Sequence, residues 1–483
     1  MRSYYTSDQV RAAEAALIGT LPDGVPMQRA AYGLATVVAA ELRDRTGGVA
    51  GRTVTLLVGS GDNGGDALWA GAMLRRRGVA VSAVLLDPAR AHAKGLAALR
   101  KAGGRIVEQI GDPDLVIDGI VGISGRGPLR PAAADLVATV TAPIVAVDLP
   151  SGVGPDTGAV DGPAVTAAVT VTFGAYKPVH VLAAPRCGRI VLVPIGARLG
   201  DPELTALDPA EVGAWWPVPG PVDDKYTQGV VGVCAGSATY PGAVVLCTGA
   251  AVAATSGMVR YAGSGAADVL AHRPEVVAAP SVRETGRVQA WVVGPGMGTD
   301  DAAYDALTDI LATDLPVLVD ADGLTMLAAD SDLARGRSAP TLLTPHAGEF
   351  ERLTGSAPSA DRVDAVRSLA QDWEVTVLLK GRTTVISAPD GTVFVNEAGG
   401  SWAATAGAGD VLAGVIGALL ASGIEPATAA AMGAKAHALA ANLAAANHAS
   451  GGAPISATPL LSQVRAAIGV LREQSGGGGA PPA

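Results

Sequence analysis

The sequence predicts an α/β protein of two domains, each built on a mainly parallel sheet with helices on both faces. Its 483 residues exceed what one hydrophobic core usually holds, so two domains are expected. Short apolar strands alternate with helical segments in both halves, which is typical of parallel sheets buried on both faces. The proline-rich residues 213–222 interrupt this alternation. We therefore expect domains at 1–212 and 223–472, a linker at 213–222 and a disordered tail at 473–483.

Composition excludes several classes of protein. Hydrophobic residues make up 49% of the chain and aromatic residues 4%, so the cores consist mainly of Ala, Val and Leu. The formal net charge of −10 argues against binding to the nucleic acid backbone through bulk charge. Cys187, Cys234 and Cys247 lack metal-site spacing and are expected in the core, which suits a reducing cytoplasm. With no secretory signal and no apolar run long enough for a membrane span, we expect a cytoplasmic protein with no membrane partner.

The first half begins with two helical segments and continues as alternating strands and helices. The helices are predicted over residues 8–18, 27–45 and 66–77, and the strands over residues 53–58, 79–86, 115–118, 144–148 and 169–173. In such a sheet ligands bind at the carboxyl ends of the strands.

Polar loops follow three of these strands. Residues 59–66 form a predicted loop rich in backbone amides, which suits a phosphate or a ribose. Asp118 ends a second strand, and Asp148 ends a third. Asn63, Asp118 and Ser151 carry hard oxygen donors that could share a monovalent or divalent cation. Each loop taken alone is also compatible with an ordinary turn or helix cap, so the case for a site depends on the three loops meeting at one edge.

These motifs together resemble the NAD(P)H-hydrate epimerase family, the YjeF N-terminal domain, over residues 1–210. The resemblance implies a Rossmann-like three-layer fold that interconverts the R and S forms of hydrated NADH and NADPH, with K⁺ held by Asn63, Asp118 and Ser151. The family usually has Asn and Gly where this chain has Asp62 and Ala67. The implied substrate-binding residues are Asp62, Asn63, Gly64, Gly65, Asp66, Gly122, Ile123, Ser124, Gly125, Arg126, Gly127, Pro128 and Asp148.

Two residues of this half are candidates for further roles. Epimerisation at a hydrated ring carbon requires reversible loss of water, so a carboxyl group in a closed pocket could supply the acid and base, and Asp148 is the candidate. Lys177 either meets a phosphate or faces solvent, and the sequence favours neither.

The second half resumes the alternation. Strand-bearing segments are predicted at residues 229–236, 291–298, 316–323, 342–349 and 375–384, with a helix over 242–257. The last motif is Thr405-Ala-Gly-Ala-Gly-Asp410, followed by apolar residues at helical spacing over 411–420. Amides at the start of that helix lack intrahelical partners and would bind an anion such as a phosphoryl group in transfer, while Asp410 could accept a proton. The alternative is a glycine-rich helix entry with a capping Asp.

This order of motifs resembles a ribokinase-like fold, and more closely the ADP-dependent NAD(P)H-hydrate dehydratase family, the YjeF C-terminal domain, over residues 223–472. The motifs that support this resemblance are Lys225-Tyr226, Gly236-Ser237 with Tyr240 to Ala243, Gly294 to Gly298, Thr344 to Glu349 and Gly407 to Asp410. The resemblance implies Mg²⁺ and ADP in this domain, and assembly into a homo-oligomer. The implied contacts to the hydrate are Ala243, Gly298, His346 and Asp410, and those to the nucleotide are Lys380, Gly381, Arg382, Thr383, Thr384 and Gly409.

Histidines receive mixed interpretations. His346 follows Thr344-Pro345 and either contacts the hydrate or caps a helix. We expect surface or packing roles for the other histidines considered, His92, His272, His437 and His448.

Taken together, the motifs predict a bifunctional repair enzyme that epimerises NAD(P)HX and dehydrates the S form at the expense of ADP, giving AMP and phosphate. ADP rather than ATP follows from the resemblance alone. Two alternatives stay open: a ribokinase-like small-molecule kinase fused to a nucleotide-binding module, and a first domain that only binds ligands.

Overall fold

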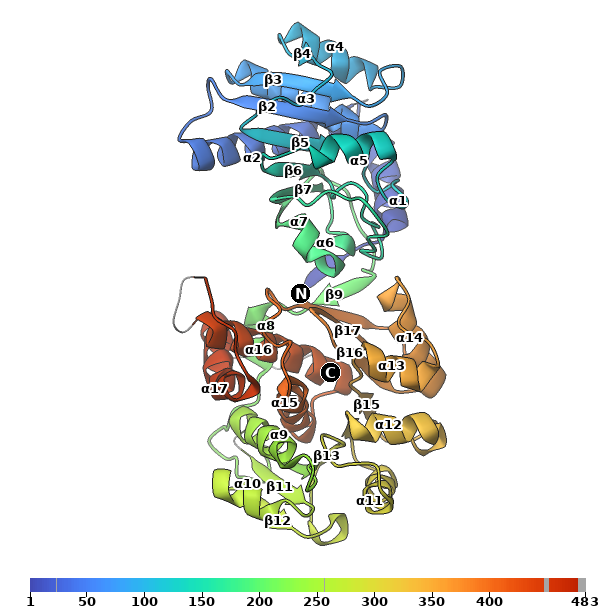
Figure 1. Ribbon diagram of the computed structural model, residues 1–483, viewed down its shortest axis with the longest axis vertical. Coiled ribbons are helices and arrows are strands. Elements are labelled where there is room, and N and C mark those ends of the chain that lie inside the picture. The colour runs from blue at the N-terminus through green and yellow to red at the C-terminus, as the bar shows by residue number, and fades with distance from the viewer. Residues whose placement is uncertain (23, 256, 447–450, 477–483) are drawn as a thin grey trace. The chain divides into compact units, whose positions relative to one another are not determined.

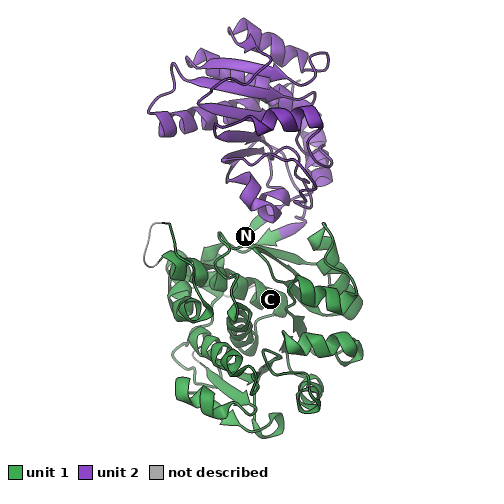
Figure 2. Cartoon of the chain, viewed as in Figure 1, with its two compact units in different colours: residues 1–2, 205–483 green, residues 3–204 purple. Residues whose placement is uncertain are grey.

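The computed structural model describes residues 1–22, 24–255, 257–446 and 451–476 (Figure 1). The chain forms two compact units, which Figure 2 distinguishes by colour. The smaller unit comprises Ser3–Leu204, and the larger comprises Met1–Arg2 with Thr205–Ala483. Of the predicted tail, residues 477–483 lie outside the described residues, and helix α17 (Ala457–Gln474) extends into its beginning.

The division between the units lies between Leu204 and Thr205, before the proline-rich segment, whereas the prolines predict a boundary after residue 212. Strand β9 (Leu204–Ala206) pairs with β18 (Val393–Glu397), and helix α8 (Pro209–Trp215) follows it. Trp216 is 3% exposed and donates a hydrogen bond through Nε1 to Ala254 O over 3.1 Å. The first part of the predicted linker therefore belongs to the core of the larger unit.

The smaller unit contains a parallel sheet of seven strands in the order β4-β3-β2-β5-β6-β7-β8. The strands are β2 (Thr53–Val58), β3 (Ala80–Leu85), β4 (Arg105–Ile106), β5 (Leu115–Gly119), β6 (Ile144–Val147), β7 (Val169–Phe173) and β8 (Arg189–Val193). The helices are α1 (Ser7–Ile18), α2 (Val25–Thr46), α3 (Asp62–Arg76), α4 (Ala93–Lys101), α5 (Pro131–Ala138), α6 (Val179–Leu182) and α7 (Ala184–Cys187), and a short strand β1 (Arg2–Tyr4) precedes them. The predicted alternation is confirmed.

One local prediction in this unit is wrong. Residues 62–66, expected in a loop, form the first turn of α3. A Cβ atom on Gly64 would lie 2.3 Å from Gly59 O, so the missing side chain lets the start of the helix pack directly on the end of β2. The glycines therefore serve close packing, and the amides of Asp62 to Gly64 lie at a helix N-terminus.

The larger unit is built on a mixed sheet in the order β9-β18-β17-β16-β15-β14-β13-β10-β11-β12. From β16 to β12 in this order, all neighbouring strands are parallel. Strand β17 runs antiparallel to both of its neighbours, β16 and β18. The strands are β10 (Val230–Cys234), β11 (Met258–Ala262), β12 (Val277–Ala279), β13 (Ala290–Val293), β14 (Val317–Val319), β15 (Thr341–Leu343), β16 (Thr376–Leu379) and β17 (Thr383–Ser387). The predicted strand-bearing segment 375–384 thus includes a hairpin turn at residues 380–382.

Helices pack on this sheet as Figure 1 shows. They are α9 (Pro241–Ala254), α10 (Ala266–His272), α11 (Asp301–Leu311), α12 (Asp322–Ala329), α13 (Ala347–Thr354), α14 (Arg362–Trp373), α15 (Ala408–Ala421) and α16 (Pro426–Ala446), with two 3₁₀ turns at Val282–Glu284 and Ser331–Leu333. Residues of α9, α15, α16 and α17 share one hydrophobic core made largely of Ala, Val and Leu. Cys187, Cys234 and Cys247 are free and buried, as expected, and burial raises the pKa of the Cys187 and Cys234 thiols to about 12.

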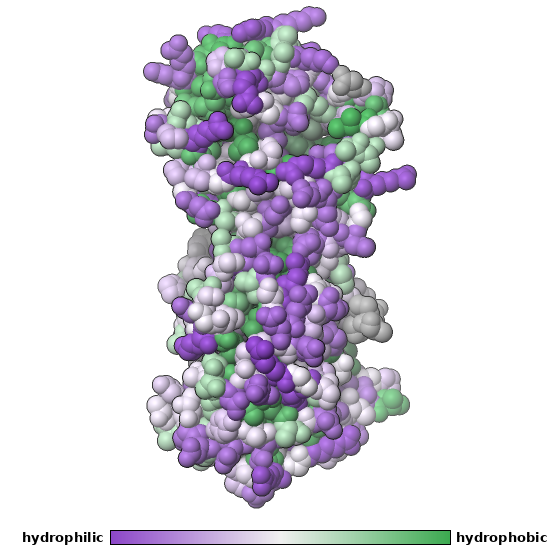
Figure 3. All heavy atoms as spheres, turned by 90° about the vertical axis from the view of Figure 1, so that its right-hand side faces the viewer, coloured by the Kyte–Doolittle hydropathy of each residue, from purple (hydrophilic) through white to green (hydrophobic). Residues whose placement is uncertain are grey.

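The surface is mixed in character. Hydrophilic side chains are spread over the face drawn in Figure 3, interspersed with smaller apolar areas. Among the described residues, none of the helices combines the length and the hydropathy needed to cross a membrane.

A substitution at Gly414 tests the close contact between α15 and α9. A Cβ atom there would lie 2.2 Å from Cys247 O, so Gly414→Ala should lower the free energy of unfolding of the larger unit by about 1–3 kcal/mol. Gly469→Ala is the matched control, because its Cβ would meet nothing within 4 Å and helix propensity should stabilise α17 by about 0.5–1 kcal/mol. Urea unfolding followed by tryptophan fluorescence measures both, since all the tryptophans except Trp69 lie in the larger unit. Equal shifts in the two variants would contradict the packing argument.

Candidate functional sites

In the smaller unit, the predicted cation ligands lie at the carboxyl ends of neighbouring strands. Asp118 Oδ1 accepts a hydrogen bond from Ser151 Oγ over 2.7 Å, and its Oδ2 accepts one from Ser151 N over 2.9 Å. Asn63 Nδ2 donates to Val147 O over 2.7 Å, and its amide also lies against Gly122. The structure therefore brings Asp118 and Ser151 into direct contact and places Asn63 on the adjoining helix start.

The chemistry of these donors fits a cation. Asp118 is 1% exposed and Ser151 is fully buried, and the described residues provide no cationic side chain in contact with Asp118. Burial raises the pKa of Asp118 to about 6, although the hydrogen bonds from Ser151 and Ile120 act to lower it. A buried carboxylate is costly without a compensating charge, and K⁺ binds carboxylate, amide and hydroxyl oxygens. The oxygen donors of Asn63, Asp118 and Ser151 would suit it.

Asp148 lies in a buried polar cluster directly after β6. Its φ angle is +69°, a left-handed conformation that is uncommon outside glycine. Lys177 Nζ donates to Asp148 Oδ1 over 2.5 Å, and Thr172 Oγ1 lies 3.1 Å from the same oxygen. Lys177 is 1% exposed, so neither sequence interpretation of it is correct: it neither faces solvent nor is open to a phosphate, but forms a buried ion pair.

A cavity of about 570 Å³ lies beside the start of α3. Asp62 and Asp66 line it, together with five residues that were not predicted as site residues: Glu14, Trp69, His92, Lys94 and Phe173. Asp66 is 6% exposed, and its Oδ1 has no hydrogen-bond partner among the described residues. Burial, followed by the negative charges of Asp148, Asp62 and Glu14, raises the pKa of Asp66 well above its usual range. Glu14 belongs to α1 and carried no motif, so its place at this cavity depends on tertiary packing alone.

Other predicted substrate residues fall outside this cavity. Residues 122–128 form an irregular segment after β5, in which Arg126 is exposed and Gly125 N donates to Gly122 O over 2.8 Å. Arg11 donates to Ile123 O over 2.9 Å. The candidate residues of the smaller unit therefore fall into three groups: one around the cavity, one around Asp118 and Gly122, and Asp148 with its partner Lys177, which are not among the residues that line the cavity.

In the larger unit, α15 begins after Gly407, whose φ angle is +82° and which has no side-chain cap. The first amides of the helix therefore lack side-chain acceptors. A Cβ atom on Gly409 would lie 3.5 Å from Lys380 Nζ, so a cation faces the start of this helix. Lys380 Nζ lies 2.7 Å from Asp320 Oδ1 and 3.4 Å from Glu349 Oε2. The helix dipole and this lysine together favour an anion at the glycine-rich turn.

Asp410 lies in the first turn of α15 and is half-buried. Burial raises its pKa to about 7, and the carboxylates of Asp320, Asp322 and Glu349 add to this effect while Lys380 opposes it. A carboxyl group with a pKa near neutrality can accept and release a proton under physiological conditions. Asp320, Asp322 and Glu349 were not selected from the sequence as site residues, although acidic residues at the end of a strand are a usable signal.

His346 caps helix α13, as the alternative sequence interpretation predicted. Its Nδ1 accepts hydrogen bonds from the amides of Gly348 and Glu349 over 3.0 and 3.2 Å. Its Nε2 lies 3.4 Å from Glu349 Oε1, and the residue is also in the wall of the pocket described next. Capping and a position at the site are therefore compatible.

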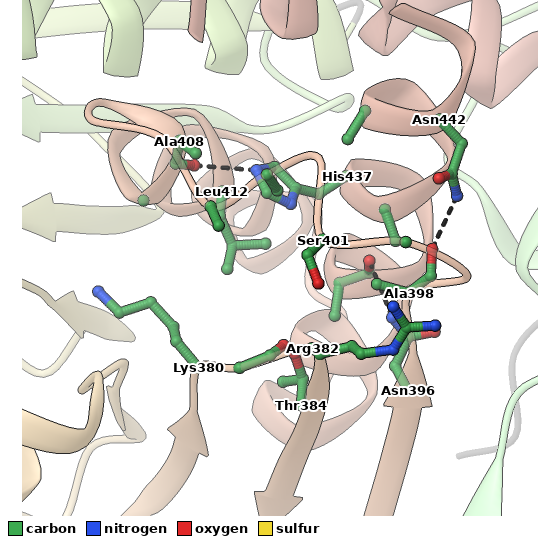
Figure 4. A pocket seen from close by; sticks show the side chains of 18 of the residues that line it. Lys380, Arg382, Thr384, Asn396, Ala398, Ser401, Ala408, Leu412, His437 and Asn442 are labelled. Atoms are coloured by element: carbon green, nitrogen blue, oxygen red, sulfur yellow. Dashed lines mark hydrogen bonds between the residues drawn. The ribbon is translucent and has the colours of Figure 1, made fainter. Parts of the chain in front are cut away.

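A pocket of about 290 Å³ adjoins the start of α15 (Figure 4). Lys380 lies on one side of it, and Asn396 and Asn442 lie on the other. The predicted nucleotide residues Lys380, Gly381, Arg382, Thr384 and Gly409 line it, whereas Thr383 does not, because successive side chains of strand β17 point to opposite faces. Small side chains form much of the wall: Ala398, Ala403, Ala404, Ala408, Ala434, Ala438 and Ala441.

The predicted hydrate contacts Ala243, Gly298 and Asp410 are not among the residues that line this pocket. Gly298 N donates to Asp322 Oδ2 over 2.9 Å. Ala243 lies in the first turn of α9 against Gly296, on which a Cβ atom would come within 2.7 Å of the Ala243 Cβ. Both turns follow strands of the parallel part of the sheet, at the edge where α15 begins.

The other histidines divide as follows. His437 is 8% exposed and donates through Nε2 to Ala408 O, which confirms a packing role, but it also lines the pocket. His92 caps α4 and lines the cavity of the smaller unit. His272 is exposed, as predicted, and His448 lies outside the described residues.

Comparison with known proteins agrees with the two-part arrangement. Residues 24–179 match the family model described as YjeF-related protein N-terminus, and residues 231–462 match the model described as NAD(P)H-hydrate dehydratase. Among solved structures, an ADP/ATP-dependent NAD(P)H-hydrate dehydratase from Bacillus subtilis, co-crystallised with ATP and Mg²⁺, is 25% identical; the match covers 54% of this chain and 97% of that one, with a TM-score of 0.47. A ribokinase-like superfamily protein from Enterococcus faecalis is 21% identical over 57% of this chain and 98% of that one, with a TM-score of 0.49.

Full-length relatives are much more similar. The bifunctional NAD(P)H-hydrate repair enzyme of Mycobacterium leprae is 62% identical over 98% of this chain and 100% of its own length. The enzyme of the same name from Mycobacterium tuberculosis is 65% identical over 89% of this chain and 92% of its own length. Because this similarity extends across both units, the chain belongs to the family of bifunctional NAD(P)H-hydrate repair enzymes.

Proposed function

We propose that the smaller unit interconverts the R and S hydrates of NADH and NADPH, and that the larger unit dehydrates the S hydrate with ADP, giving NAD(P)H, AMP and phosphate. The observation that supports the dehydratase activity is that three functional groups come together at the start of α15. Gly409 and Lys380 line one pocket, and Asp410 follows in the same helical turn. Family membership supports both activities.

The dehydration follows from what these groups can do. Asp410 accepts the proton of the hydrate's hydroxyl, and the oxygen then attacks the terminal phosphorus of ADP, with AMP as the leaving group. The amides at the start of α15 and the Lys380 ammonium stabilise the negative charge on the phosphoryl group in transfer. The ring nitrogen of the hydrate then supplies the electron pair that expels phosphate as the C–O bond breaks, and loss of a ring proton restores the dihydronicotinamide.

Mg²⁺ fits the acidic surroundings of this site. Asp320, Asp322, Glu349 and Asp410 place several carboxyl groups around one lysine. Among the described residues, no group of three acidic, histidine or cysteine side chains lies close enough to hold a metal alone. Mg²⁺ usually binds through substrate phosphates, water and one or two carboxylates. When bound, the ion neutralises phosphate charge.

In the smaller unit, Asp148 is the proposed acid and base of epimerisation. Reversible loss of the hydroxyl from the hydrated carbon requires a proton donor, and return of water to the opposite face requires an acceptor. Asn63, Asp118 and Ser151 would hold K⁺ at the neighbouring strand ends, where the ion offsets the buried charge of Asp118.

Asp410→Asn tests the base. The amide cannot accept the hydroxyl proton, so the dehydration rate should fall by about 10²–10⁴-fold while ADP binding changes little. The rate is followed as recovery of dihydronicotinamide absorbance with release of phosphate. Asp390→Asn, on the exposed turn before β18, is the control and should keep the wild-type rate. An unchanged rate in Asp410→Asn would remove its role, and a stable phosphorylated product of the wild type would indicate a small-molecule kinase instead.

The pH dependence of dehydration should report the same group. Because the pKa of Asp410 is raised to about 7, the carboxylate needed as base is lost as the pH falls below that value. We expect kcat/KM to decline about tenfold per pH unit below roughly pH 7 and to level off above it. A pH profile of the wild type checks this, and the residual activity of Asp410→Asn should lack that decline.

Potassium should stabilise the smaller unit. Binding to the folded state alone adds about 1.4 kcal/mol to the free energy of unfolding when K⁺ is at ten times its Kd. Calorimetry of the full chain in KCl, against tetramethylammonium chloride at the same ionic strength, measures this. Asp118→Asn should abolish the effect, whereas Asp135→Asn, at an exposed position of α5, should retain it. A K⁺ effect that survives Asp118→Asn would place the ion elsewhere.

A further inference from the structure

Three buried polar side chains surround Asp148, and the proposed epimerisation uses only Asp148 itself. Thr172 is fully buried, and Lys177, His180 and Asp148 are 1%, 2% and 5% exposed. Buried ionisable groups of this kind are stable only when their hydrogen-bonding capacity is satisfied, so each contact limits what each group can do.

The backbone of Asp148 is held on both sides. Asp148 N donates to Val171 O over 2.7 Å, and His180 Nε2 lies 2.9 Å from Asp148 O. The tautomer of His180 follows from its other contact, since Nδ1 accepts a hydrogen bond from Lys177 N over 2.9 Å and the proton is therefore on Nε2. Burial lowers the pKa of His180 to about 4, so the ring stays neutral. These bonds maintain a left-handed conformation that a non-glycine residue would otherwise leave.

The three donor hydrogens of Lys177 are all engaged. Its Nζ contacts Asp148 Oδ1 at 2.5 Å, Thr172 Oγ1 at 2.9 Å and Phe173 O at 3.1 Å. An ammonium group has three N–H donors and no acceptor, so no donor remains for a ligand. Because the group is also inaccessible, Lys177 cannot touch the substrate in this arrangement.

The two oxygens of Asp148 therefore differ. Oδ1 accepts from Lys177 and lies next to Thr172, while the described residues give Oδ2 no hydrogen-bond partner. The neighbouring acids are Asp62, Asp66 and Glu14, whose charges bear on this cluster. Lys177 thus places one positive charge among four carboxyl groups and engages only one of the two oxygens of Asp148.

We propose that Lys177 is a positioning residue for epimerisation: it fixes the Asp148 carboxylate through Oδ1 and presents Oδ2 to the hydrate. This inference rests on the proposed epimerase activity of the smaller unit. It extends that proposal by assigning a role to a residue that never contacts the substrate. A misplacement of an acid or base by about 1 Å can reduce a rate on the order of 10²-fold, which sets the expected effect.

The test is a double-mutant cycle on the full chain. Lys177→Met should lower kcat for conversion of R-NADHX to S-NADHX about 10²-fold and change KM less than about threefold, because no substrate contact is lost. In an Asp148→Asn background the same substitution should have almost no further effect. Lys177→Arg should restore part of kcat, because it keeps the charge. Lys101→Met, at an exposed position of α4 in the same unit, is the matched control and should behave as wild type.

Two further measurements keep the outcome interpretable. Lys177→Met leaves Asp148 buried without its cation and could unfold the smaller unit, so Thr172→Val, which keeps both charges, provides a milder variant. It should lower kcat about three- to tenfold at unchanged KM, again only when Asp148 is present. The rate at which the larger unit dehydrates the S hydrate measures the amount of active protein in each sample, and kcat for epimerisation is divided by this amount.

The outcomes separate the two proposals. Additive losses in the double variants, a rise in KM at constant kcat, or equal defects in Lys177→Arg and Lys177→Met would each overturn the positioning role while leaving the epimerase activity in place. A wild-type chain that dehydrates the S hydrate but does not convert the R hydrate would overturn the epimerase activity, and the inference would fall with it.

Discussion

The close approach of backbone to backbone at glycines is the constraint on which both candidate sites depend. In the smaller unit, Gly64 brings the start of α3 onto the end of β2, where a Cβ atom would lie 2.3 Å from Gly59 O. In the larger unit, Gly414 brings α15 against α9, where a Cβ atom would lie 2.2 Å from Cys247 O. The first contact sets the start of α3 at the carboxyl end of β2, where polar residues collect, and the second holds α15 closely against α9.

The two sites share an electrostatic arrangement. Each has one buried or half-buried lysine among several carboxyl groups: Lys177 pairs with Asp148, and Lys380 pairs with Asp320 and Glu349. In each site a further carboxyl group has no lysine paired with it among the described residues, and its pKa is raised, as for Asp66 and Asp410. Environments that separate the protonation of neighbouring carboxyl groups provide both a proton acceptor and a proton donor. Both units therefore place a carboxyl group with a raised pKa near a pair formed by a lysine and a carboxylate.

Much of the fold could be predicted because periodicity and glycine placement are local properties. The strands β2, β3, β5, β6 and β7 and the start of the α15 helix were predicted close to their observed positions. The start of α3 was misplaced because glycine and asparagine favour turns when read locally, whereas packing on β2 stabilises a helical turn there. The division between the units was misplaced for a related reason, since the prolines were visible in the sequence and the burial of Trp216 was not.

The sequence by itself determined the alternation of strands and helices, the glycine-rich start of α15 with Asp410 in it, and the position of Asp148 directly after a strand, because these follow from residue type and spacing along the chain. Only the tertiary structure decided which charges meet. Lys177 is 29 residues from Asp148, and Lys380 is 60 residues from Asp320, yet each pair is in contact. Glu14 likewise reaches the cavity of Asp66 from a helix without a motif. The physical reason is that burial and electrostatic pairing depend on distances in space, which the order of parallel strands sets and local sequence does not encode.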